Sequence, residues 1–159
     1  MVNTALGLEE AQLKATEKTL NQLLSDEFVL TAKTLCAHWN IHGAGFRSRH
    51  LLLDEQYHTL IDICDSIAER VRALGGRALG SLHGFHENTR LKEFDEHKVL
   101  PDAKGLLSAL VDDHEAIVRE LRLKHDNVAE RQHDVATVSL MEDLILQHEK
   151  MAWFLRSEL

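Results

Sequence analysis

Four long stretches of helical hydrophobic periodicity constrain the fold of this chain more than any other feature of its sequence. In each stretch, apolar residues recur every three or four positions, as on one face of an α-helix. Glycines between the first two stretches and Gly75-Gly76 after the second interrupt the pattern, because glycine is a poor residue for a helix interior. Asp102 follows the single proline and is a suitable N-cap for the third stretch. The predicted helices run from about Glu9 to Asn40, from Phe46 to Leu74, from Asp102 to His125, and from the end of a polar turn at 126–134 to near the C-terminus.

The connection between the second and third helices is long. It covers residues 80–100, and a short helix is predicted within it around Thr89–His97. Two helices, a long crossover and two further helices predict an all-α fold, a four-helix bundle. A chain of 159 residues suits one domain, residues 1–159, with residues 1–8 as a short N-terminal tail.

The charge of the chain favours cationic partners. Lys plus Arg against Asp plus Glu is 18 − 26, a net charge of −8, and such a surface repels DNA phosphates and anionic lipids. Eleven histidines are a notable feature, because histidine is the commonest transition-metal ligand, although most of them are expected to be ordinary surface residues.

No secretory signal or membrane-length apolar run is visible, so a cytoplasmic protein without a membrane partner is expected. Cys36 and Cys64 lie outside any CxxC pair and are predicted to be buried thiols.

The second helix has two distinct faces when its residues are placed at 3.6 per turn. An apolar face, expected to pack into the chain's own bundle, contains Leu53, Tyr57, Leu60, Cys64, Ile67, Val71 and Leu74. A narrow polar row, called the outer stripe below, contains Asp54, His58, Asp62, Asp65 and Glu69 at helical spacing. The outer stripe is predicted to point away from the bundle.

Periodicity alone leaves two interpretations of the outer stripe open. The usual one is a solvated helix face. Alternatively, the stripe binds a multivalent cation, because its acids repel one another and only Arg70 and Arg72 lie nearby in sequence to offset them. Carboxylate and imidazole ligands together suit iron, manganese or zinc rather than calcium. If the stripe binds metal, the remaining ligands must come from another chain.

Glu-x-x-His, a motif of bundles that hold two iron ions between their own helices, occurs twice. The two copies are Glu55–His58 and Glu130–His133. In such bundles the motif must point into the interior, but the first copy lies outside the apolar face and the second lies in the predicted polar turn. Both matches are therefore interpreted as incidental, since the pattern is weak.

A longer pattern spans the end of the first helix and most of the second. It comprises residues 37–46 (AHWNIHGAGF), His50, Asp54-Glu55, residues 65–70 (DSIAER) and residues 74–76 (LGG). Residue types and spacings match together over about forty positions, and in this the chain resembles the Dps family of ferritin-like proteins. The resemblance extends more loosely to Trp153-Phe154. It implies a ferritin-like four-helix subunit, with a short helix in the crossover, assembled as a hollow homo-dodecamer.

The resemblance also implies iron-oxidising centres shared between subunits. One subunit would provide His38 and His50, and its neighbour Asp65 and Glu69. Asp54 would be a further ligand or a hydrogen-bond partner that orients a ligand. By this resemblance the centre oxidises Fe(II), with hydrogen peroxide as the preferred oxidant. Ferric oxide is then stored inside the shell, and the cell is protected from oxidative damage.

Other expectations concern iron entry and additional metal sites. Acids around a three-fold pore would attract cations, and Glu130 and Asp134 are candidates, although both are equally well interpreted as solvated loop charges. The crossover histidines His83, His86 and His97 could bind a further metal, although loop histidines are more often simply exposed.

Two residues near the predicted centre also receive a role by resemblance. Trp39 is expected beside the centre, a position compatible with core packing. Glu55 is a candidate among cavity carboxylates that could nucleate mineral.

Strong DNA binding is not expected, although basic-tailed members of the family coat DNA. Residues 1–20 contain Lys14 and Lys18 against three glutamates, and the chain ends with Arg156-Ser157-Glu158-Leu159, so neither end supplies a cluster of positive charges. Two alternative functions remain. A DNA-compacting protein of this family requires a basic patch, and a di-iron oxidase with its site inside one bundle requires inward-facing Glu-x-x-His pairs.

Overall fold

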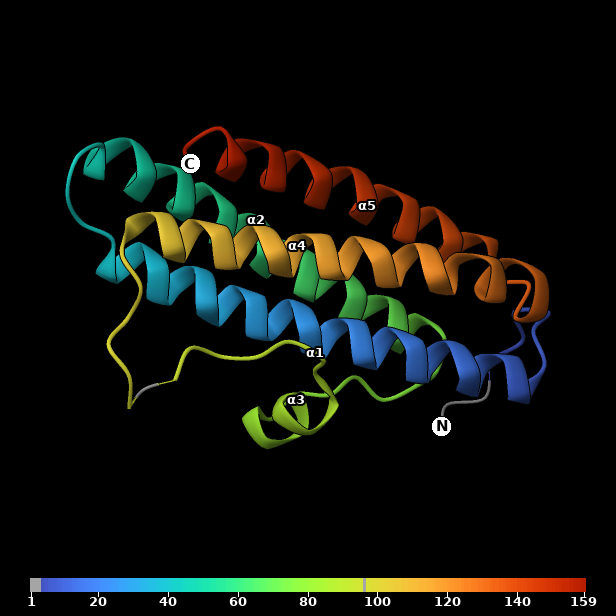
Figure 1. Cartoon of the computed structure of the whole chain (residues 1–159). Coiled ribbons are helices and arrows are strands. Elements are labelled where there is room, and N and C mark those ends of the chain that lie inside the picture. Colours follow the sequence, from blue (N-terminus) through green and yellow to red (C-terminus); the bar gives the residue numbers. More distant parts are fainter. Residues whose placement is uncertain (1–3, 96) are drawn as a thin grey trace.

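The computed structural model describes residues 4–95 and 97–159, which form a bundle of four long helices (Figure 1). Among the described residues there are no strands, and none of the helices is long and apolar enough to cross a membrane. Of the predicted tail, residues 4–8 precede the first helix, whereas residues 1–3 lie outside the described part. The elements are α1 (Glu10–Asn40), α2 (Phe46–Ala73), α3 (Leu82–Asn88), α4 (Ala103–Asp126), the π-helical turn η1 (Asn127–Arg131) and α5 (Val135–Arg156).

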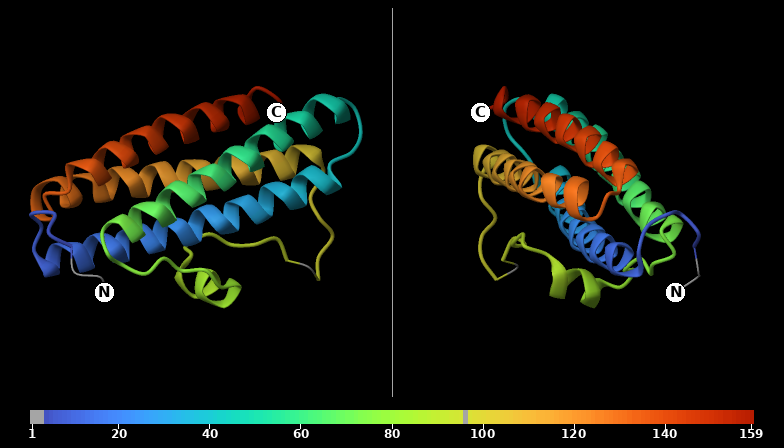
Figure 2. Two further views of the ribbon diagram at one scale, coloured as in Figure 1. Left: turned by 180° about the vertical axis from the view of Figure 1, so that it is seen from behind. Right: turned by 90° about the vertical axis from the view of Figure 1, so that its right-hand side faces the viewer.

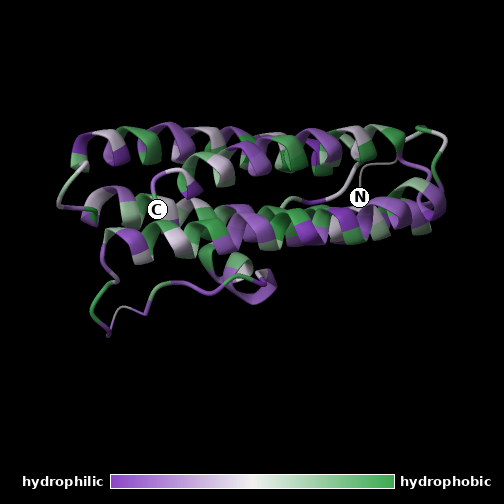
Figure 3. Cartoon of the chain, turned by 45° about the horizontal axis from the view of Figure 1, so that its top comes forward, coloured by the Kyte–Doolittle hydropathy of each residue, from purple (hydrophilic) through white to green (hydrophobic). Residues whose placement is uncertain are grey.

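The direction of the helices explains the long crossover. α1 packs along α2 and α4 along α5, each pair antiparallel, whereas α2 and α4 run in the same direction (Figures 1 and 2). The chain must therefore return along the whole bundle between α2 and α4, and it does so over α1. Polar and apolar residues alternate around the long helices (Figure 3). The fully buried side chains of the core include Leu20, Leu30, Leu53, Leu60, Ile67, Leu106, Leu110, Ile117, Leu121, Met141 and Leu144.

Local capping fixes where the helices begin and end. Glu9 forms a capping box with Gln12, and the Asp102 side chain accepts a hydrogen bond from the Gly105 N–H, as predicted for this N-cap. Gly75 ends α2 with a φ of 83°, a left-handed conformation that glycine adopts without a steric penalty. The predicted bounds of the four long helices are thus close to the observed ones.

Two local predictions were wrong. The short helix of the crossover lies at 82–88 instead of 89–97, because Ser81 caps it and Phe85 anchors it by stacking on Phe28 at 4.2 Å. The supposed polar turn at 126–134 is largely helical, since α4 continues through Asp126 into η1. Gln132, at the end of that turn, is buried and accepts a hydrogen bond from Thr16 of α1.

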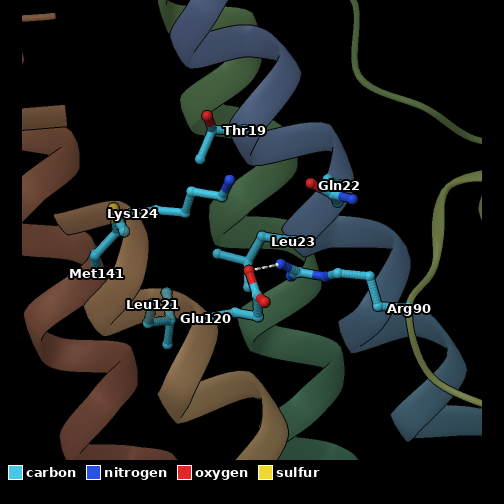
Figure 4. Close-up of a pocket in the computed structure, with 8 residues that line it drawn as sticks. All are labelled: Thr19, Gln22, Leu23, Arg90, Glu120, Leu121, Lys124 and Met141. Carbon is cyan, nitrogen blue, oxygen red and sulfur yellow. Dashed lines mark hydrogen bonds and ion pairs between the residues drawn. The ribbon is translucent and has the colours of Figure 1, made fainter. Parts of the chain in front are cut away.

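The crossover is held on the bundle by ion pairs. Arg90 bonds the buried Asp26 of α1 and Glu120 of α4, and Figure 4 shows its guanidinium reaching Glu120 across a small hollow. The hollow has a volume of about 10 Å³, room for no more than one water. A second ion pair, Lys33–Asp113, joins α1 to α4, and the crossover contacts it through Phe94, whose ring centre lies 5.1 Å from the Lys33 ammonium. The Arg90 ion pairs thus add to the apolar contacts of Phe85, Leu91 and Phe94 in fixing the crossover on the bundle.

A chain of polar side chains crosses the centre of the bundle. His148 of α5 bonds Glu27 of α1 through Nε2 (2.9 Å) and His114 of α4 through Nδ1 (2.8 Å). All three side chains are fully buried, and Glu27 Oε2 and His114 Nε2 have no partner. Burial first, and then the neighbouring His148, lower the pKa of His114 well below 6.5.

The buried His114 makes the subunit sensitive to acid. Folding lowers the pKa of His114, so below pH 6.5 the unfolded chain binds a proton at this residue and the folded chain does not. The contribution of His114 to the unfolding free energy is therefore fully present above pH 6.5 and decreases as the pH falls. Between pH 7.5 and 5.5 this one group should cost about 1.4 kcal/mol of unfolding free energy. Urea unfolding at the two pH values measures the loss. His114→Gln, which does not titrate, should show a loss smaller by that amount, and an equal loss in both proteins would contradict the assignment.

Candidate functional site

His38 and His50 face each other where α1 ends and α2 begins. The two rings stack at 3.8 Å, and each Nδ1 bonds the other residue's backbone carbonyl, at 3.0 and 2.9 Å. A carbonyl oxygen only accepts, so both Nδ1 atoms carry the hydrogen and both Nε2 atoms keep a lone pair. This is the arrangement that metal-binding histidines adopt, with the second ring nitrogen bonded to a carbonyl or carboxylate.

Asp54 lies one helical turn beyond His50, next to this histidine pair. Its Oδ1 is 3.9 Å from His38 Nε2, and the Tyr57 ring packs edge-on against His38. Burial first, and then the Asp54 charge, raise the pKa of the Tyr57 phenol. His38, His50 and Asp54 are called the histidine half-site below. Imidazole and carboxylate are donor types that transition metals accept, and this half-site places them at one end of the α1–α2 hairpin.

Asp65 and Glu69, the carboxylate half-site, lie near the far end of α2. Both side chains are exposed, as are His58 and Asp62, and Asp54 is partly exposed, so the outer stripe does point away from the bundle as predicted. The buried face is rotated slightly from the predicted one. Gln56 and Ile63 are buried, whereas Tyr57 and Cys64 are half-buried. A long amide can enter the core here because Gln56 donates to the Met151 carbonyl.

The two half-sites of one chain are far apart. His50 and Asp65 are separated by 65 − 50 = 15 residues of continuous helix, which is roughly 22 Å at 1.5 Å per residue. Within the described residues of the single chain, no three His, Cys, Asp or Glu side chains are gathered as a cation site. A metal held at the histidine half-site is therefore out of reach of the chain's own Asp65 and Glu69.

The Glu-x-x-His pairs do not point into the bundle. Glu55, His58, Glu130 and His133 are all exposed, which agrees with their interpretation as incidental matches. The polar residues that do occupy the bundle centre, Glu27, His114 and His148, were missed by sequence reasoning. The sequence did contain an indication of them, because each of these polar residues occupies a position where the helical periodicity calls for an apolar one. Because the cluster contains one carboxylate and His148 uses both ring nitrogens, it lacks the donor set of an intra-bundle di-iron site.

Asp134 is excluded as a pore residue, because its side chain is buried and already paired. It bonds the Arg70 guanidinium at 2.6 Å and caps α5 through Thr137. Glu130 is exposed, and its role at a pore stays a prediction. His83, His86 and His97 are exposed as well, and His83 lies 3.3 Å from Glu87 of its own helix.

Two other sequence predictions concern the thiols and Trp39. Both cysteines are half-buried, not buried, and burial next to Glu27 raises the pKa of Cys64 to about 12. Cys64 is therefore a neutral thiol at physiological pH. Trp39 is 70% exposed, so it is not a core residue of the subunit.

Comparison with known proteins identifies the class of the chain. A model of the ferritin-like domain matches residues 17–159. The chain is 40% identical over 152 residues to a low temperature-induced protein of Nostoc, covering 96% of this chain and 84% of that protein. It is 31% identical over 144 residues to the DNA protection during starvation protein of Helicobacter pylori, covering 91% of this chain and 98% of the other.

A solved structure agrees with these matches. The Dps protein of Vibrio cholerae superposes with a TM-score of 0.88 at 30% identity, covering 99% of this chain and 96% of that one. It is described as a member of a broad superfamily of ferritin-like diiron-carboxylate proteins. The fold and the matches thus define a ferritin-like protein. Within that class the chain belongs to the Dps family, as its sequence predicted.

The Arg70–Asp134 pair should be important for stability, because it ties the end of α2 that carries Glu69 to the start of α5. Asp134→Ala removes the N-cap and leaves Arg70 without its partner, so it should lower the unfolding free energy by about 3 kcal/mol. Denaturant unfolding measures the change. Asp112→Ala, at an exposed carboxylate of α4, is the control and should change the free energy by less than about 0.5 kcal/mol. Equal effects would show that the pair contributes no more than a surface charge.

Proposed function

We propose that this protein is an iron-oxidising and iron-storing mini-ferritin whose catalytic centres form between subunits. In each centre one subunit provides His38, His50 and Asp54, and a second provides Asp65 and Glu69. The observation that carries the proposal is the separation of the two half-sites, roughly 22 Å along one rigid helix. Neither half-site is a complete iron site alone, whereas together they offer two imidazoles and three carboxylates to Fe(II) as substrate.

The chemistry follows from these ligands. Fe(II) held by neutral imidazoles and carboxylates keeps coordination positions open to an oxidant. With hydrogen peroxide, two ferrous ions give one electron each, and peroxide takes both electrons and two protons to form two waters. Because the electrons are taken in a pair, no hydroxyl radical is released. The ferric product is hydrolysed and stored as oxide within a dodecameric shell, which both stores iron and limits oxidative damage.

Exposed apolar side chains near the half-sites support a partner subunit there. Trp39 follows His38 directly, Phe46 and Leu51 flank His50, and Ile61 lies between the two half-sites on α2. Such side chains are commonly covered in an assembly. A second copy of the chain that covers them would also bring its carboxylate half-site to the histidine half-site.

Complementation between two inactive variants tests whether the centres are shared. His38→Ala and Asp65→Ala should each slow the oxidation of Fe(II) by peroxide, because each removes one half of every centre. Shells reassembled from an equal mixture should regain roughly a quarter of the wild-type rate, because a mixed pair contains one doubly altered centre and one intact centre. Absorbance of the ferric product gives the rate. If the mixture stays as slow as the single variants, the ligands do not come from two subunits.

DNA protection by direct binding is not part of this proposal, although relatives carry that name. A net charge of −8 repels the phosphate backbone. The assembled protein should therefore leave plasmid mobility unchanged in a gel at neutral pH and physiological salt. The same chain with an added oligolysine tail is the positive control and should retard the plasmid. Retardation by the unmodified protein would contradict the prediction.

A further inference from the structure

His58, in the middle of the outer stripe, has the features of a metal ligand but has no role in the proposed iron centre. Its side chain is 61% exposed, and its ring packs on Tyr57 at 4.1 Å. Its Nδ1 donates to the Asp54 carbonyl (2.8 Å) and lies 3.6 Å from the Asp54 carboxylate. Nδ1 therefore carries the hydrogen, and Nε2 presents a lone pair to the outside of the bundle.

The surroundings of His58 distinguish it from an ordinary surface histidine. His42 also bonds a backbone carbonyl, that of Asn40 at 3.2 Å, so this bond alone does not mark a ligand. At His58 the bond is joined by a carboxylate beside the same nitrogen, the carboxylate–histidine arrangement that supports bound metals. Asp62 lies one turn further along α2 and is exposed on the same stripe, where a cation can contact both side chains.

The negative charge of the outer stripe is not neutralised by nearby arginines. Arg70 is bonded to Asp134 and Thr137 of α5, and Arg72 to the Gly76 carbonyl. Arg70 and Arg72 are the two basic residues that the sequence suggested could offset the negative charge of the outer stripe. When two copies of α2 approach each other, their carboxylates repel unless a cation lies between them.

The proposed centres fix how two copies of α2 face each other. In two antiparallel copies of one helix, the numbers of any two facing residues add up to the same value. Asp54 facing Asp65 gives 54 + 65 = 119, and His50 facing Glu69 gives 50 + 69 = 119, so both pairings fit one arrangement. The helices are then antiparallel, with the two-fold axis between residues 59 and 60. His58 and Asp62 lie within about one turn of that axis in both copies. Two imidazoles and two carboxylates therefore meet there.

We propose that a transition-metal site lies on this two-fold axis, midway between two iron centres, with His58 Nε2 and the Asp62 carboxylate of each subunit as ligands. The inference rests on the proposed function, because the shared centres set the register of the helices. This donor set suits a borderline divalent cation such as Zn²⁺ or Co²⁺. The ion offsets the carboxylate repulsion and clamps the two subunits together.

Titration of the apo-protein shell with Co²⁺ in a calorimeter tests the site. His38→Ala disables the iron centres, and this variant should still bind one Co²⁺ per two subunits. Adding His58→Asn keeps a donor for the Asp54 carbonyl but removes Nε2, so affinity for that ion should fall at least about ten-fold. His42→Asn in the same background is the matched control and should leave the site unchanged. Survival of the Co²⁺ site in the His38→Ala/His58→Asn protein, or its absence from His38→Ala, overturns the inference.

The same titration separates this inference from the proposed function. If wild type and His38→Ala bind the same number of Co²⁺ ions, the histidine half-site is not a metal site, and the proposed function fails together with the register that depends on it. If His38→Ala loses ions but His58→Asn does not, only the axial site is wrong. Anomalous scattering from Co²⁺-loaded crystals provides a second measurement, in which a cobalt peak on the two-fold axis supports the site and an empty axis contradicts it.

Discussion

The rigidity of α2 is the constraint on which the rest of this structure depends. A continuous helix from Phe46 to Ala73 cannot bend its two ends together, so residues at its start and near its end remain roughly 22 Å apart in every subunit. One face of the helix must also pack into the core. Polar side chains near the two ends of the outer face therefore cannot meet within one subunit, and the proposed centres need a second subunit to bring them together.

Two groups of carboxylates in the chain differ in their partners. Asp26, Asp113 and Asp134 each pair with an arginine or lysine. These pairs tie the crossover to α1, α1 to α4, and α2 to α5. The exposed carboxylates of the outer stripe are different, because the arginines nearest to them bond elsewhere. The first group holds the subunit together, and the second is available to cations. The buried Glu27–His148–His114 chain belongs with the first group, since hydrogen bonds through His148 join α1, α4 and α5 inside the core.

Most of the fold was predictable because helix periodicity and capping are local. Asp102 caps α4 and Gly75 ends α2 through interactions within a few residues of each, so the sequence was enough to place them. The short helix of the crossover was misplaced because its anchor is distant. Phe85 stacks on Phe28, and Arg90 is held by Asp26, so contacts with α1 decide which crossover residues become helical. The rotation that buries Gln56 also depends on a distant partner, the Met151 carbonyl.

The sequence by itself determined the class of fold, the family, and which face of α2 carries the outer stripe, because each depends on spacing along the chain. Only the tertiary structure decided that His38 and His50 hold each other's rings through backbone carbonyls, that Asp134 is committed to Arg70, and that a glutamate and two histidines share the bundle centre. Each of these depends on a distance between atoms of different helices. Packing sets such distances, and no local pattern encodes them.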